Sequence, residues 1–522
     1  MRDCAGDCDP RAISLEAGDR LADRVPGRAG SDAPPRFDRG RRHVVGAVAL
    51  LLVIHGALVG SSATRHSPTQ NEAAHLVAGL VQWRFGRFEV YRVNPPLVHY
   101  AAALPVMLAG YHPNWGSYSY ELKGARSEMV MGGDFIRANG ERSAWLVTLA
   151  RWGCLPFTLA GALFCFFWSR ELWGSSTAGL ISLFVWCFEP FLMAHAELIT
   201  TDCAATSLGL GAGYVFWRWL RHPSWRGALV AGAVLGLAQL TKTTWIVLFG
   251  LWPALWLFWI GTRAGTTPAP DDRPATARAA TQLAVLLVLG VYVLNLGYFF
   301  DGTLTKLGEF AFKSRAFAGA VKEGASGNRF AGTWLGKVPV PLPRNYLLGI
   351  DFQKKDFENR DDASFLLGEW KNGGWWYYYL YGLSAKTSLG LQALLGLGVF
   401  TVLVRGRRAP NRHQAICPRA GESESRPTVE SASVGRGAGL WSGSTGFRDL
   451  VILAAPGVTV LALVSAQVQF NHHVRYVLPA LGFAIVFVGS VAWWFVPGRP
   501  HRVRPEPVGR PRAESTRPAV PA

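Results

Sequence analysis

The chain has 522 residues, of which 50% are hydrophobic and 17% are charged, and its formal net charge is +18. A soluble chain of this length would form roughly two to four domains with about 25% charged residues. No glycine period or heptad pattern is present, and the seven scattered cysteines match no disulfide framework or zinc spacing. These features exclude collagen, coiled coils and small disulfide-rich proteins, and they predict an all-α polytopic membrane protein.

The positive charge lies beside apolar segments. Arg36, Arg39, Arg41 and Arg42 precede the first apolar segment, and six arginines follow Pro497. Basic flanks of this kind are typical of cytoplasmic loops. The distribution therefore favours membrane lipids as partners and argues against a nucleic acid.

The chain begins with a polar segment, 1–42, which is predicted to be a disordered cytoplasmic tail. After it we expect ten segments able to cross an apolar layer of about 30 Å. They are 43–62, 144–168, 174–196, 199–220, 226–241, 243–262, 279–300, 378–404, 449–467 and 474–496. The segment 226–241 is only marginally long enough, and it is counted because the basic residues before it favour a cytoplasmic loop. The predicted membrane domain is 43–496, a bundle of about 10 (10–12) transmembrane helices.

One orientation satisfies all the basic flanks, with both termini cytoplasmic. Two large external segments follow, 63–143 and 301–377. Residues 95–110 open with two prolines and are expected to form a helix at the outer interface instead of an eleventh span. The segments 263–278 and 405–447 read as flexible cytoplasmic linkers, and 497–522 as a disordered basic cytoplasmic tail. The composition suits the inner membrane of a bacterial cell.

Ionisable groups near membrane depth are candidates for function. Glu72 and His75 are three residues apart, hence on one face of a helix after the first span, where the carboxylate is compatible with a general base. An ordinary interfacial helix is the alternative. Asp202 follows Thr200 and Thr201, and a helix cap explains these residues as well as a sugar contact does.

Two later positions carry positive charge at the predicted outer face. Lys242 could bind a lipid phosphate, or its ammonium group could extend to the membrane interface without binding a ligand. Arg475 has no acidic neighbour in sequence, so a phosphate is a plausible partner. His472 and His473 are adjacent and do not share a helical face, so surface histidines are favoured over metal ligands. The aromatic run at 375–379 is typical of an interfacial belt, with sugar stacking as the alternative.

Together these positions resemble the lipid-carrier-dependent GT-C glycosyltransferases, a superfamily of dolichyl-phosphate-mannose protein mannosyltransferases and aminoarabinose transferases. The matching motifs are N-E-A-A-H at 71–75, G-R-F at 86–88, N-P-P-L at 94–97, T-D at 201–202, G-L through T-K at 236–242, G-W-W-Y-Y at 374–378 and R-Y-V-L-P at 475–479. Each motif alone is weak, and their order along the chain carries the resemblance.

The resemblance implies a GT-C-like bundle whose external first loop bears juxtamembrane helices. It implies transfer of a monosaccharide from a polyprenyl-phosphate donor by inverting displacement, on the extracytoplasmic side and with no obligatory metal or other cofactor. The acceptor, whether lipid, protein or glycan, stays unknown, as does the sugar. The residues expected to act are Glu72 and Asp202 in catalysis, Lys242 and Arg475 at the lipid phosphate, and Asn71, His75, Asn94, His99 and Tyr476 at the substrate.

The first-loop motif departs from the family at one position. Asn71 stands where the family has the aspartate regarded as the base, and an amide does not accept a proton at neutral pH. Glu72 is the preferred replacement. Asp202 is a second possibility, and a catalytically degenerate relative is a third. A multi-pass transporter or flippase of lipid-linked or glycan substrates is the main rival function, and it predicts repeats and broken helices near mid-membrane.

Overall fold

The computed structural model describes residues 36–118, 127–262, 273–320, 325–358, 363–408, 446–466, 471 and 473–495. Most of the predicted tails 1–42 and 497–522, most of the linkers 263–278 and 405–447, and His472 therefore lie outside the described residues. The residues after His43 form one compact unit, which is the part discussed below.

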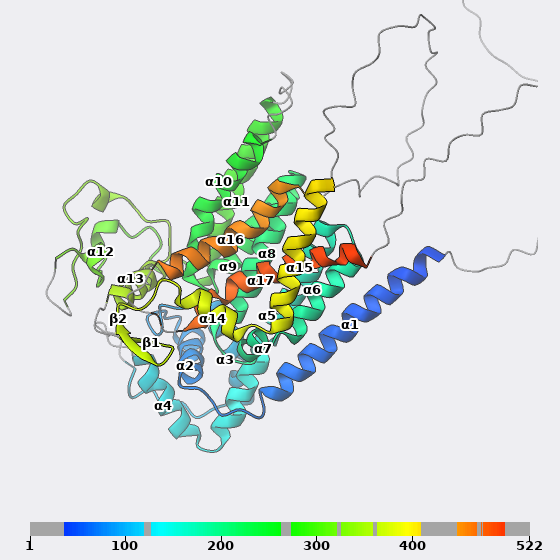
Figure 1. The fold of residues 1–522 in the computed structure, drawn as a ribbon. Coiled ribbons are helices and arrows are strands. Elements are labelled where there is room, and N and C mark those ends of the chain that lie inside the picture. The colour runs from blue at the N-terminus through cyan, green and yellow to red at the C-terminus, as the bar shows by residue number, and fades with distance from the viewer. Residues whose placement is uncertain are drawn as a thin grey trace, which may run out of the picture. The chain divides into compact units, whose positions relative to one another are not determined.

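The described residues are mostly helical (Figure 1). The first half contains α1 (Arg36–Ser62), α2 (Gln70–Phe85), α3 (Leu97–Ala109), α4 (Ser127–Asn139), α5 (Arg142–Trp173), α6 (Ser176–Phe188), α7 (Pro190–Ala196), α8 (Thr201–Arg221), α9 (Trp225–Gln239), the 3₁₀ turn η1 (Thr243–Val247) and α10 (Leu248–Gly261). The second half contains α11 (Arg273–Gly297), η3 (Leu307–Glu309), α12 (Arg315–Ala318), η4 (Leu335–Lys337), α13 (Arg344–Glu358), β1 (Ala363–Leu366), β2 (Glu369–Asn372), α14 (Tyr378–Lys386), α15 (Leu389–Arg408), α16 (Phe447–Ser465), η6 (Val474–Val477), α17 (Leu478–Val488) and η7 (Gly489–Trp494). The strands β1 and β2 form an antiparallel hairpin.

Six helical segments in the described part of the chain are long and apolar enough to cross a membrane, and the number rises to eight if each of two bent pairs is one span. The prediction of ten is therefore not reached. Helices α8 and α9 occupy the predicted spans 199–220 and 226–241, but neither is among the six or eight. Helix α9 has only 15 residues, which is short for a crossing of about 20 residues.

The two bent pairs divide segments that were predicted as single spans. Helices α6 and α7 meet at 62° around Glu189 and Pro190, and α14 and α15 meet at 110° around Thr387 and Ser388. Proline lacks the N–H needed to continue a helix, which accounts for the first break. The predicted interfacial segment 95–110 is a helix, α3, with 13 residues, too few to cross.

Small residues allow the helices to approach closely. A Cβ at Gly232 would lie 2.6 Å from the carbonyl oxygen of Leu286, and one at Gly236 would lie 2.5 Å from Val293 Cβ. Both glycines are on α9 four residues apart, so α11 packs directly on the α9 backbone. Gly209 on α8 makes room for Trp245 in the same way, with a Cβ-to-ring distance of 1.8 Å. The first two contacts join α9 to α11, and the third places η1 directly against α8.

Candidate active site

Asp202, Lys242 and Arg475 form a charged cluster at one end of the bundle. Lys242 Nζ donates to Asp202 Oδ1 at 2.6 Å, and Arg475 Nε lies 3.5 Å from Asp202 Oδ2. Lys242 Nζ also lies 5.2 Å from the centre of the Tyr476 ring, a distance at which a cation is attracted to an aromatic face. The structure thus brings together residues from three distant parts of the sequence.

Local structure explains how each charged side chain reaches the cluster. Asp202 is in the first turn of α8, where the helix dipole favours a carboxylate. Lys242 lies in the turn between α9 and η1, with extended backbone. That turn is held by Gln239, which donates to the carbonyl of Trp245 and accepts from the hydroxyl of Tyr346. Arg475 is in η6, directly before α17.

The first loop contacts this cluster through its N-P-P-L segment. Thr201 Oγ1 donates to Asn94 Oδ1 at 3.2 Å, and the backbone N–H of Leu97 donates to the carbonyl of Leu240 at 3.0 Å. Asn94 is half-buried beside the start of α8. The first loop, the T-D motif and the T-K motif therefore form one continuous structure.

His75 and His99 form a buried chain of hydrogen bonds that begins at Gln82. The amide of Gln82 donates to His99 Nδ1 at 3.1 Å, and His99 Nε2 lies 2.9 Å from His75 Nδ1. If His99 accepts at Nδ1, the proton of His99 is on its Nε2, which donates to His75 Nδ1. The proton of His75 is then on its own Nε2. Burial lowers the pKa of His99 to about 3, and it lowers the pKa of His75 well below its ordinary value, with further contributions from His99 and Arg475. Both rings are neutral, and His75 carries its N–H on the ring nitrogen that does not contact His99.

Glu72 has a different environment from the one the sequence suggested. Its side chain is fully buried and pairs with both Nε and an Nη of Arg151, at 2.7 and 2.8 Å. The backbone N–H groups of Thr69 and Ile199 donate to the same carboxylate at 2.9 and 3.2 Å. Each carboxylate oxygen therefore accepts two hydrogen bonds, which leaves little capacity for a substrate proton. This geometry favours a structural role for Glu72 and does not support its predicted role as the base.

Some buried polar atoms in or next to the cluster have no hydrogen-bond partner among the described residues. They are His195 Nδ1, Thr200 Oγ1 and Arg475 Nε. Buried polar groups are normally satisfied, so each such atom needs an explanation. Asp202, Lys242 and Arg475 are among the charges that act electrostatically on the His195 ring.

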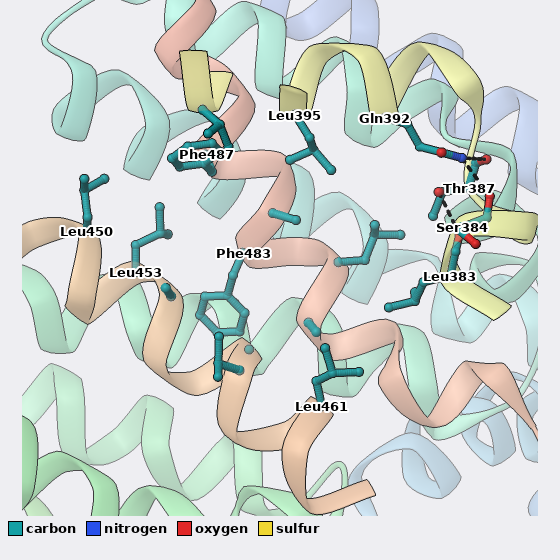
Figure 2. A pocket seen from close by; sticks show the side chains of 17 residues that line it. Leu383, Ser384, Thr387, Gln392, Leu395, Leu450, Leu453, Leu461, Phe483 and Phe487 are labelled. Atoms are coloured by element: carbon teal, nitrogen blue, oxygen red, sulfur yellow. Dashed lines mark hydrogen bonds between the residues drawn. The ribbon is translucent and has the colours of Figure 1, made fainter. Parts of the chain in front are cut away.

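An apolar groove of about 520 Å³ runs between α14, α15, α16 and α17. Figure 2 shows Ser384 and Thr387 at one end and Leu450 at the other, with Phe483 and Leu461 between them. The hydroxyls of Ser384 and Thr387 donate to backbone carbonyls of their own helix. The lining is therefore almost entirely hydrocarbon, and one end of the groove lies at the break between α14 and α15.

The structure brings some of the predicted site residues together and leaves others apart. Asp202, Lys242, Arg475 and Tyr476 lie together, while Glu72 and half-buried Asn71 lie at the start of α2. Arg151 and His195 were not predicted from the sequence. Arg151 could have been found, because an arginine inside the apolar segment 144–168 needs a buried partner. No group of three or more potential metal ligands occurs in the described part of the chain.

The chain is structurally similar to ArnT from Cupriavidus metallidurans over most of its length. A crystal structure of ArnT bound to undecaprenyl phosphate aligns with a TM-score of 0.45 and 15% sequence identity, covering 86% of this chain and 59% of that chain. The apo structure aligns with a TM-score of 0.46 and 15% identity, covering 87% and 60%. This chain thus spans about 60% of the length of ArnT. No family model and no curated protein matches the sequence.

Proposed function

We propose that this chain is a multi-pass membrane glycosyltransferase that moves a monosaccharide from a polyprenyl-phosphate donor to an acceptor on the extracytoplasmic side, with both termini cytoplasmic. The observation that carries the proposal is the contact of Lys242 and Arg475 with the same carboxylate, Asp202. Two cations and one anion leave one positive charge. That charge complements the single negative charge of a phosphodiester donor.

The apolar groove supports a lipid-linked donor. Its volume of about 520 Å³ lies within the range of about 300–1,000 Å³ that is typical of ligand pockets. It begins at Ser384 and Thr387, close to the break that precedes α15, and continues between α15, α16 and α17. We propose that it holds the first isoprene units of the carrier, while the phosphate lies at Lys242 and Arg475. A polyprenyl phosphate is also the ligand in one of the two ArnT structures.

In the proposed reaction, a hydroxyl oxygen of the acceptor forms a bond to the anomeric carbon as the bond from that carbon to the phosphate oxygen breaks. The electron pair leaves with the phosphate, whose charge goes from −1 to −2. Lys242 and Arg475 neutralise this developing charge. The attack and departure occur on opposite faces of the sugar, so the configuration is inverted.

We assign the proton of the acceptor hydroxyl to Asp202. One oxygen of Asp202 is 3.5 Å from Arg475 Nε, too long for a hydrogen bond, whereas every oxygen of Glu72 already accepts two. When Asp202 accepts a proton, the cluster gains one positive charge as the phosphate gains one negative charge. Proton transfer and departure of the phosphate therefore support each other electrostatically.

Around this core, we propose contacts to the substrate for His75, His99, Asn94, Asn71 and Tyr476. The N–H of neutral His75 donates to a phosphate or sugar oxygen, and His99 fixes the ring of His75. Asn94 aligns the first loop with α8 through Thr201. The mechanism needs no metal or other cofactor from the protein.

A transporter or flippase is the second candidate, because both bent pairs, α6 with α7 and α14 with α15, are broken helices of the kind that line transport sites. A catalytically degenerate relative is the third. The sequence feature behind it is Asn71.

The test uses purified protein in lipid nanodiscs, with a panel of polyprenyl-phosphate sugars and a membrane extract as acceptor. We expect release of free polyprenyl phosphate by the wild type and its loss in Asp202→Asn. If no donor is cleaved, activity gained by Asn71→Asp indicates a lapsed enzyme. If the wild type instead moves an intact lipid-linked sugar across a proteoliposome membrane without cleaving it, the transporter is correct and the transferase proposal is wrong.

A further inference from the structure

Lys386 is the last residue of α14, a helix that contributes to the lining of the apolar groove. Its neighbours Ser384 and Thr387 line one end of the groove. Gly382 is four residues earlier on the same helical face, and a Cβ there would lie only 2.5 Å from Val474 Cγ2. Val474 directly precedes Arg475. The face of α14 that bears Lys386 is therefore packed against the segment that bears Arg475.

A buried carboxylate holds the break after Lys386 in place. Glu189 accepts from the backbone N–H of Ser388 at 3.0 Å and from its hydroxyl at 2.6 Å. Glu189 is 2% exposed and immediately precedes α7, the helix that bears His195. The two broken helix pairs are thus joined at Glu189 and Ser388. This link keeps the end of α14 beside α7.

The charges around His195 complete the geometry. The groups that act on its ring are Asp202, Arg475, Lys386 and Lys242. Lys386 is exposed, so its ammonium group is available to a ligand.

We infer that Lys386 is a third phosphate-binding cation, which holds the dianionic carrier phosphate at the mouth of the groove as the carrier is exchanged. This inference rests on the proposed function. After transfer, Asp202 loses its proton to water and again neutralises one of the two cations. The remaining charge of +1 balances only half of a monoester dianion, and Lys386 supplies the second positive charge. The diester donor, with one negative charge, does not need it.

If Lys386 binds the carrier phosphate, it should favour the dianionic monoester over the singly charged diester. Lys386→Met is expected to weaken binding of polyprenyl phosphate about tenfold or more, the effect of losing one charge-assisted hydrogen bond. Binding of a diester, such as the methyl ester of polyprenyl phosphate, is expected to change less than about threefold. Lys386→Arg is expected to keep the wild-type affinities. Lys337→Met, at an exposed lysine of the second large loop, is the matched control and is expected to change neither.

The experiment measures binding of both lipids to the full chain in nanodiscs at pH 8, where the monoester is a dianion. Unfolding temperatures of all variants confirm that each is folded. Equal loss of monoester and diester affinity, or no loss, overturns the role of Lys386. If phosphatidic acid competes for the site as well as polyprenyl phosphate does, the role of Lys386 is also overturned, because the groove would then bind ordinary membrane lipid. If the wild type binds neither polyprenyl lipid, the proposed function itself fails, which distinguishes the two failures.

Discussion

The pair of Glu72 and Arg151 provides a direct test of whether Glu72 stabilises the fold or acts as a base. Arg151 is 1% exposed, and besides its two bonds to Glu72 it donates to the backbone carbonyls of Ala63, His66 and Ser67. The pair thus ties the end of α1, the start of α2 and the middle of α5 together. We expect Glu72→Gln and Arg151→Met each to lower the free energy of unfolding by about 3–5 kcal/mol, because each leaves one buried charge without its partner.

The assay is denaturant unfolding in detergent micelles, run beside the transfer assay on the same preparations. The double variant Glu72→Gln with Arg151→Met removes both charges, so it is expected to lose less than the sum of the two single variants. The reasoning is refuted if Glu72→Gln abolishes transfer while its unfolding free energy stays at the wild-type value. That result would mean that Glu72 is the base and that its hydrogen bonds rearrange when substrate binds.

Three further predictions address the phosphate site, the histidines and the packing. Lys242→Met is expected to weaken binding of polyprenyl phosphate by about 10–100-fold, since it removes a charge-assisted hydrogen bond; a titration in nanodiscs that finds unchanged affinity would contradict the phosphate site. His99 has a pKa of about 3 in the folded chain against about 6.5 unfolded. The folded state therefore binds fewer protons, and stability is expected to fall by about 1.4 kcal/mol per pH unit as the pH drops below 6.5. His99→Gln should show a shallower loss in the same denaturation series. Gly79→Ala would put a Cβ 2.2 Å from the carbonyl oxygen of His99, and we expect it to cost about 1–3 kcal/mol with displacement of α3. A melting temperature equal to that of the wild type would show that the α2–α3 contact tolerates the change.

Much of the membrane character could be predicted from the sequence because it depends on local composition. Long apolar segments must be helical and buried in lipid, and the short helix at 97–109 was predictable from the two prolines before it. The breaks inside 174–196 and 378–404 were not predicted, although Pro190 is a local signal for the first one. The cause of the second break is long-range, since Ser388 is held by Glu189, a residue 199 positions away in the sequence.

The charged side chains divide in the same way. Asp202, Lys242 and Arg475 could be selected from the sequence, because each is a charged residue beside an apolar segment. The order of the motifs along the chain gave a second reason to select them. Their contact, and the choice between two carboxylates, depended on tertiary structure. Glu72 and Asp202 look alike in sequence, each beside the start of a helix. Only the folded chain puts Arg151 on both oxygens of Glu72 and puts Lys242 and Arg475 on Asp202. The availability of a carboxylate for chemistry is set by the hydrogen bonds that it already accepts, and those come from residues far away in the chain.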